Sequence, residues 1–125
     1  MLNKMGIKAR NAAAVLAKST DAQRIAALLR MSENLMDDTE LILAANQEDL
    51  TAAAGTGMTQ AMLDRLALTP KRVTVMAQAL RETAALPDPL GEILWEDTRP
   101  NGLQIHRVSV PLGVIALIFE ARPNV

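Results

Sequence analysis

The sequence contains no cysteine and no tyrosine, and it has one tryptophan and one phenylalanine. The lack of cysteine excludes a disulfide scaffold, a zinc site built on thiolates and a thiol nucleophile within these 125 residues. With so few aromatic rings, the chain offers no platform on which nucleic-acid bases could stack. Basic and acidic residues nearly balance, at a formal net charge of −1. The chain therefore lacks the excess of positive charge that is typical of a general nucleic-acid binder.

Long apolar runs are also scarce. The longest run of large apolar residues covers 114–119, which is six residues long, whereas a bilayer-spanning helix needs roughly 20. Basic residues precede the apolar stretch 12–17, as in a secretion signal, but that stretch is short and Lys18 interrupts it. We therefore expect a small amphipathic helix there, in a soluble cytoplasmic protein without a membrane segment. The length of 125 residues favours one domain at most.

Helical periodicity and capping signals dominate the first two-thirds of the sequence. Thr20 and Gln23 have the spacing of a capping box. Thr69-Pro70 combines an N-cap residue with proline at the first helical position, where its missing N–H costs nothing. We expect a helix over 3–18 and a second one from Thr20 to Met36. A third is expected over 40–54, with Asp37-Asp38-Thr39 as its cap and Gly55 at its end. A short fourth helix should follow Thr59, and a fifth should begin at Pro70 and end before Pro87.

The 3.6-residue period indicates which faces of these helices are buried. In the last helix it selects Val73, Met76, Ala77, Leu80 and Ala84. The polar stretch 46–49 is interpreted as solvated helix surface.

The pattern becomes β-like after residue 91. Residues 92–97 and 103–110 are typical of strands, and the turn residues of 98–102 join them into a hairpin. Leu103 and Ile105 fall on one face, whereas Val108 and Val110 fall on the other. This slip of parity predicts a bulge near residues 106–107.

Residues 114–119 form a continuous apolar run without alternation. Such a run is typical of a central parallel strand buried on both faces. A parallel partner needs a crossover of a dozen or more residues, and six residues remain after this run. We therefore expect an α/β protein of which this chain is an N-terminal piece.

The residues directly after that run are the main candidates for a ligand site, because ligands of open α/β sheets bind beyond the carboxyl ends of the strands. This position is held by Glu120, Ala121, Arg122, Pro123 and Asn124. Pro123 holds Arg122 extended, and the Asn124 amide could stabilise an oxyanion. An ordinary strand exit remains the alternative.

Other polar residues carry weaker signals. Arg65 could bind a substrate carboxylate, although a surface ion pair with Asp64 is the commoner arrangement. His106 is the single histidine and is expected at the surface of the hairpin. No metal site is expected.

Two strings of residues resemble the γ-glutamyl phosphate reductase family, also called glutamate-5-semialdehyde dehydrogenase, of the aldehyde dehydrogenase superfamily. They are VPLGVIALIFEARPNV at 110–125 and MLDRLALTP at 62–70. Residues 46–49 fit the segment before them, so the resemblance runs collinearly through the chain. Ala116 and Phe119 stand where the family pattern leads us to expect Gly and Tyr.

The resemblance implies reduction of γ-glutamyl phosphate by NADPH to glutamate 5-semialdehyde and phosphate, in proline biosynthesis. In that chemistry a cysteine thiolate displaces phosphate to form a thioester, which is then reduced. Asn124 matches the oxyanion-hole asparagine of the superfamily, while the family's cysteine has no counterpart here. The residues that the resemblance assigns to the nicotinamide cleft are Phe119, Glu120, Ala121, Arg122 and Pro123.

The resemblance also implies a domain organisation and partners. Residues 1–91 would be the helical part of the cofactor-binding domain, 92–110 the hairpin of an oligomerisation flap, and 111–125 the first parallel strand and cofactor loop. A homo-oligomer is expected, together with an association with glutamate 5-kinase. Two alternatives remain open, which are a stand-alone helical interaction module and another aldehyde or acyl-phosphate dehydrogenase.

Overall fold

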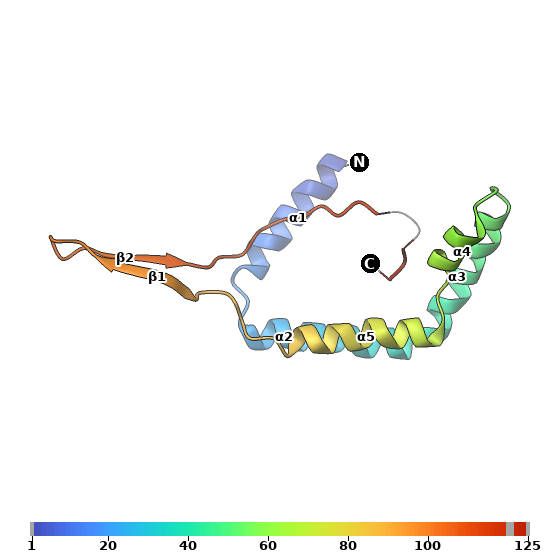
Figure 1. Cartoon of the computed structure of the whole chain (residues 1–125), viewed down its shortest axis with the longest axis horizontal. Coiled ribbons are helices and arrows are strands. Elements are labelled where there is room, and N and C mark those ends of the chain that lie inside the picture. The colour runs from blue at the N-terminus through green and yellow to red at the C-terminus, as the bar shows by residue number, and fades with distance from the viewer. Residues whose placement is uncertain (1, 120–121, 125) are drawn as a thin grey trace. The chain divides into compact units, whose positions relative to one another are not determined.

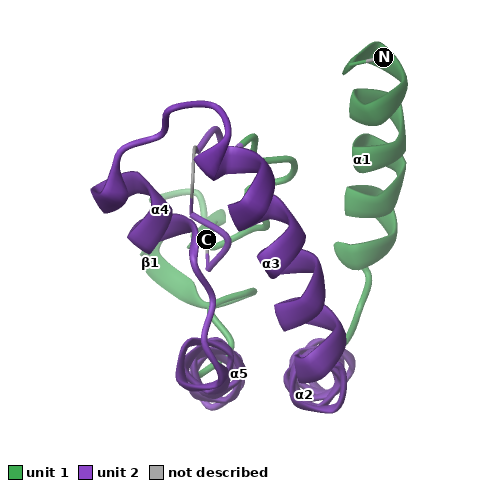
Figure 2. Ribbon diagram, turned by 90° about the vertical axis from the view of Figure 1, so that its right-hand side faces the viewer, with its two compact units in different colours: residues 1–21, 87–116 green, residues 22–86, 117–125 purple. Residues whose placement is uncertain are grey.

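The structure, a computed structural model, describes residues 2–119 and 122–124. It divides into two compact units, shown in green and purple in Figure 2. One comprises Met1–Asp21 and Pro87–Ala116, and the other comprises Ala22–Leu86 and Leu117–Val125. The division predicted from the sequence, at residues 91 and 110, stays a prediction.

The second unit consists of helices α2 (Asp21–Asp37), α3 (Thr39–Ala54), α4 (Gln60–Leu66) and α5 (Pro70–Ala84). Helices α2 and α5 lie side by side, as Figures 1 and 2 both show. Ser32 and Ala77 are fully buried at this contact. Because both side chains are small, the two helices can approach each other closely. The Ser32 hydroxyl donates a hydrogen bond to the Ala77 carbonyl at 2.8 Å and so joins the two helices.

The predicted helix ends at α4 and α5 are confirmed. Thr59 accepts a hydrogen bond from the Met62 N–H at the start of α4, and Thr69 accepts one from the Arg72 N–H at the start of α5. Gly55 follows the last residue of α3, as expected. The cap predicted for α3 is wrong in one respect, because Asp38 makes no side-chain hydrogen bond to that helix.

The buried face predicted for α5 is largely confirmed. Val73, Ala77 and Ala84 are buried, whereas Met76 and Leu80 are half-buried.

The first unit contains α1 (Leu2–Leu16) and a hairpin of strands β1 (Ile93–Thr98) and β2 (Gln104–Val108). None of the α1 side chains is buried. The predicted turn forms where expected, with Gly102 donating to the Arg99 carbonyl at 2.8 Å. Gly102 has φ +83°, a conformation that suits glycine. Figure 1 shows the hairpin with β1 and β2 antiparallel.

The irregularity predicted near residues 106–107 occurs at that level of the hairpin but on the opposite strand. Ile93 pairs with Val108 and Trp95 with Arg107, so the extra residue, Leu94, lies on β1. The sequence pattern located the irregularity along the hairpin because the apolar residues of β2 change from one face of the strand to the other there. The alternation of apolar residues along one strand does not reveal which of the two strands carries the additional residue.

The strand predicted over 114–119 is not formed. Among the described residues the sheet has two strands, β1 and β2, and residues 109–119 belong to no helix or strand. A parallel strand exists only when a neighbouring strand supplies its hydrogen-bond ladder, and none of the described residues does so. Ile118 is accordingly 98% exposed.

Candidate functional site

A cavity of about 730 Å³ lies in the unit formed by residues 22–86 and 117–125. Residues of the C-terminal part of α4, the linker behind it, α5 and the C-terminal segment line it. They are Arg65, Thr69, Lys71, Arg72, Val75, Met76, Ala79, Arg122 and Asn124. Four of these side chains are cationic, and none of the lining residues that the structure describes is acidic. A concavity lined by charges of one sign raises the local concentration of ions of the opposite sign. The lining therefore suits an anionic ligand.

Asn46 holds the linker between α4 and α5, two helices that contribute cations to the lining of this cavity. Its side-chain Oδ1 accepts from the Leu68 N–H at 2.7 Å, and its Nδ2 donates to the Leu66 carbonyl at 3.0 Å. Asn46 is buried, with 5% of its surface exposed. The interpretation of 46–49 as solvated surface is therefore wrong for Asn46. The residue was missed because its partners lie about twenty positions away in the chain.

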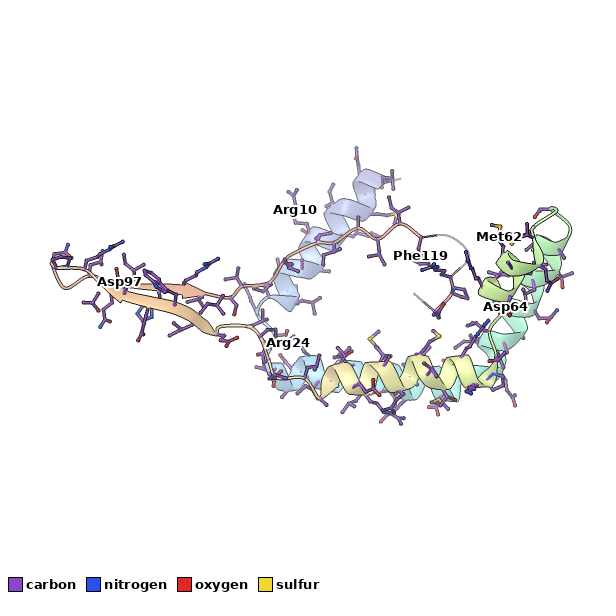
Figure 3. All side chains as sticks on the ribbon, in the orientation of Figure 1. Arg10, Arg24, Met62, Asp64, Asp97 and Phe119 are labelled. Carbon is purple, nitrogen blue, oxygen red and sulfur yellow. The ribbon has the colours of Figure 1, made fainter. Side chains whose placement is uncertain are left out.

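Arg72 is already engaged within the protein. Its guanidinium donates to the carbonyls of Asp64 and Ala67 and forms an ion pair with the Asp64 carboxylate at 3.5 Å. These contacts place a positive charge at the carbonyl end of α4, where the helix dipole favours it. Figure 3 shows Asp64 at the end of α4 that leads towards α5. Arg72 therefore fixes the linker as well as lining the cavity.

A second, smaller cavity of about 340 Å³ adjoins the first. The two share Met76, Ala79 and Asn124, and Pro123 also lines the second. The rest of its lining is mostly apolar, with Met31, Leu35, Leu80 and Thr83 from α2 and α5. Asn124 thus lies between a cation-lined space and a largely apolar one. Such an arrangement fits a ligand that has both a charged group and a short hydrocarbon part.

The structure brings together some of the residues singled out from the sequence. Arg122 and Asn124 line the larger cavity with Arg65, and Pro123 lines the smaller one. Phe119 lines neither of these cavities and is 54% exposed. Glu120 and Ala121 lie outside the described residues. The catalytic and cofactor-binding roles predicted for this segment stay predictions.

Three polar lining residues were not predicted as site residues, namely Thr69, Lys71 and Arg72. The capping signal at Thr69-Pro70 marked the start of α5, but nothing in the sequence showed that the C-terminal segment approaches it. His106 lies on β2 opposite Glu96, within the hairpin. Among the described residues, no group of three or more His, Cys, Asp or Glu side chains could hold a metal ion. None of the described helices has the length and apolarity to cross a membrane.

Comparison with known proteins shows likeness along nearly the whole chain. No family model matches it. The chain is 54% identical over 120 residues to the γ-glutamyl phosphate reductase of Moorella thermoacetica, covering 96% of this chain and 29% of that protein. It is 49% identical over 125 residues to the γ-glutamyl phosphate reductase of Paramagnetospirillum magneticum, covering 100% of this chain and 30% of that protein. The chain thus spans about 30% of the length of these curated relatives.

Solved structures show the same likeness. The crystal structure of γ-glutamyl phosphate reductase from Saccharomyces cerevisiae matches with a TM-score of 0.90 at 31% identity, over 97% of this chain and 31% of that one. The corresponding crystal structure from Thermotoga maritima matches with a TM-score of 0.84 at 35% identity, over 88% of this chain and 27% of that one.

The helices and the hairpin therefore have the fold of an N-terminal portion of an aldehyde dehydrogenase-like protein. Within that class, the resemblance to γ-glutamyl phosphate reductase that the sequence predicted is confirmed.

Proposed function

We propose that this chain is part of an enzyme that reduces L-γ-glutamyl 5-phosphate to L-glutamate 5-semialdehyde, with NADPH as reductant and phosphate as the second product. This reaction would serve proline biosynthesis. The likeness to γ-glutamyl phosphate reductases over nearly the whole chain is the observation that carries the proposal. The cation-lined cavity beside Asn124 supports it independently, because the proposed substrate is an anion with a short carbon chain.

Asn124 is the residue to which we assign a part in the chemistry. When a nucleophile adds to an acyl carbonyl, negative charge develops on the carbonyl oxygen. A side-chain amide N–H aimed at that oxygen stabilises the charge more strongly in the transition state than in the ground state. The thiol nucleophile of the proposed reaction is not among the 125 residues, which contain no cysteine.

The described residues near Asn124 fit an anionic cofactor. NADPH carries several phosphate groups, and a guanidinium binds phosphate with paired hydrogen bonds. Arg122 lines the cavity together with three other cations, and no acid is among the described lining residues, so we assign Arg122 and the backbone of 119–123 to cofactor binding. NADPH, when bound, supplies the hydride. Pro123 restricts the backbone on which Arg122 and Asn124 are presented.

The remaining parts of the proposal concern assembly. The hairpin of β1 and β2 exposes several large apolar side chains, among them Ile93, Leu94 and Trp95. An isolated two-stranded hairpin is marginally stable, and apolar side chains of this kind favour a covering partner. We assign residues 92–110 to an oligomerisation flap of a homo-oligomer, between a helical part at 1–91 and the start of the cofactor sheet at 111–125. A cytoplasmic location and an association with glutamate 5-kinase complete the proposal.

A chimaera tests the proposed reaction. This chain replaces the matching stretch of the Moorella thermoacetica relative, which is 54% identical over 120 residues. We expect NADP- and phosphate-dependent oxidation of glutamate 5-semialdehyde within about tenfold of the unmodified relative. A chimaera that melts cooperatively and binds NADPH but does not oxidise glutamate 5-semialdehyde would contradict the proposal. Preference for another aldehyde in a substrate panel would indicate a different dehydrogenase.

A further inference from the structure

We propose that Arg65 and Lys71 form the part of the site that binds the α-carboxylate of the substrate, and so select glutamyl compounds over acyl groups that lack this charge. The inference rests on the proposed function and assigns a specificity role within the same cavity. Its basis is that two cations without an acidic partner among the described residues both line that cavity.

The α4–α5 linker brings these two cations to one cavity. Arg65 belongs to the last turn of α4 and Lys71 to the first turn of α5, and both line the larger cavity. The linker between them is held by the two hydrogen bonds of Asn46. These two hydrogen bonds, which are partly buried, therefore fix the course of the linker.

Neither cation has an acidic partner in the described part of the chain. The carboxylate closest to them in sequence, that of Asp64, is paired with Arg72. Among the described residues, no Asp or Glu lines the cavity. Like charges that face one concavity repel each other unless an anion occupies it. A carboxylate is a matching ligand, because guanidinium binds it with two parallel hydrogen bonds and ammonium adds a point charge.

Spacing along α5 favours the α-carboxylate over the phosphoryl group. Asn124, which we place at the reacting carbonyl, lines both cavities together with Met76 and Ala79. Lys71 precedes Met76 by five residues, a rise of about 7.5 Å along the helix axis. In the substrate the phosphoryl group is bonded to the reacting acyl group itself. The α-carboxylate is separated from that carbonyl by three carbons, about 5 Å when extended, so it can extend towards the cations from a carbonyl at Asn124.

The reverse reaction separates the two anions, because glutamate 5-semialdehyde and inorganic phosphate then enter as different molecules. The test uses the full-length chimaera described above, with Arg65→Gln, Lys71→Gln and the double variant. Arg81→Gln is the matched control, since Arg81 is an exposed cation of α5 that does not line the cavity. KM is measured separately for the semialdehyde and for phosphate, and kcat/KM is measured for pentanal, which has no carboxylate.

We expect each single variant to raise KM for glutamate 5-semialdehyde by about 10- to 100-fold. KM for phosphate and kcat/KM for pentanal should stay at the level of the Arg81→Gln control, and Arg65→Lys should restore part of the affinity. A rise in KM for phosphate instead would assign the cations to the phosphoryl group and overturn the inference. Unchanged constants in the double variant would also overturn it. If the unsubstituted chimaera oxidises no semialdehyde, the proposed function itself fails, which is a different result from the first two.

Discussion

Asn46 of α3 accepts a hydrogen bond from the backbone N–H of Leu68 at 2.7 Å, although the two residues are 22 positions apart. The same side chain donates to the Leu66 carbonyl at 3.0 Å. One buried carboxamide therefore supplies both a donor and an acceptor to a linker that has left helical geometry. Backbone groups buried without partners are costly, so Asn46 stabilises the linker and the cations that flank it.

Replacement of Asn46 by alanine should lower the free energy of unfolding by about 2–3 kcal/mol, because two hydrogen bonds are lost and two partly buried backbone groups are left without partners. Urea denaturation of the protein measures this change. The neighbouring Gln47 is exposed, so Gln47→Ala is the control, with an expected change within about 0.5 kcal/mol. Equal stability of the two variants would show that the Asn46 contacts do not hold the linker.

The contact between α2 and α5 is expected to tolerate loss of the Ser32 hydroxyl better than an increase in size. Ser32→Ala removes one hydrogen bond to the Ala77 carbonyl and should cost about 1 kcal/mol. Ser32→Leu must fit a larger side chain at a position with no exposed surface, and it should cost about 3 kcal/mol. Glu33→Ala serves as the control, because it breaks an exposed ion pair with Arg30.

Urea midpoints rank these three variants. The prediction requires Ser32→Leu to be the least stable and Glu33→Ala to lie within about 1 kcal/mol of the parent. If Ser32→Leu matched Ser32→Ala, the two helices would not be in close contact at this point.

The helix boundaries were predictable from the sequence because capping is a local interaction. Thr59 and Thr69 each bond to an N–H three residues ahead, so spacing alone identifies them. Gly55 and Pro70 add stop and start signals within the same few residues. The Asp38 prediction failed because residue type permits a cap but does not establish the side-chain geometry.

The site was predictable only in its separate pieces. Asn124 and Arg122 were singled out from their place after an apolar run, and Arg65 from its residue type. The cavity joins residues 65–79 to residues 122–124, and that meeting is a tertiary contact without a local signal. The role of Asn46 was hidden for the same reason, because an amide on a helix surface and an amide bonded to a distant linker have the same sequence pattern.

Substitution by alanine should change stability in opposite directions at two glycines. Gly102 has φ +83° in the hairpin turn, so Gly102→Ala strains the backbone although its new methyl group meets no atom within 4 Å. We expect a local cost of about 1 kcal/mol. Gly6 lies inside α1, where a methyl group also meets nothing. Gly6→Ala should therefore stabilise that helix by about 0.5–1 kcal/mol.

Amide hydrogen exchange measures both changes locally. The Arg99 N–H, which is bonded to the Leu103 carbonyl at 2.9 Å, should exchange about fivefold faster in Gly102→Ala. The amides of α1 should exchange more slowly in Gly6→Ala. Faster exchange in both variants would mean that the backbone conformation of the glycine does not determine whether alanine stabilises or destabilises the protein.

If Asn124 acts at the reacting carbonyl, its replacement should slow turnover, which is measured with Asn124→Ala in the full-length chimaera. Loss of an oxyanion donor should lower kcat by about 10²- to 10³-fold and leave KM for glutamate 5-semialdehyde nearly unchanged. Asn34→Ala, at an exposed asparagine of α2, is the control and should keep full activity. An Asn124→Ala enzyme whose kcat equals that of Asn34→Ala would show that Asn124 takes no part in the chemistry.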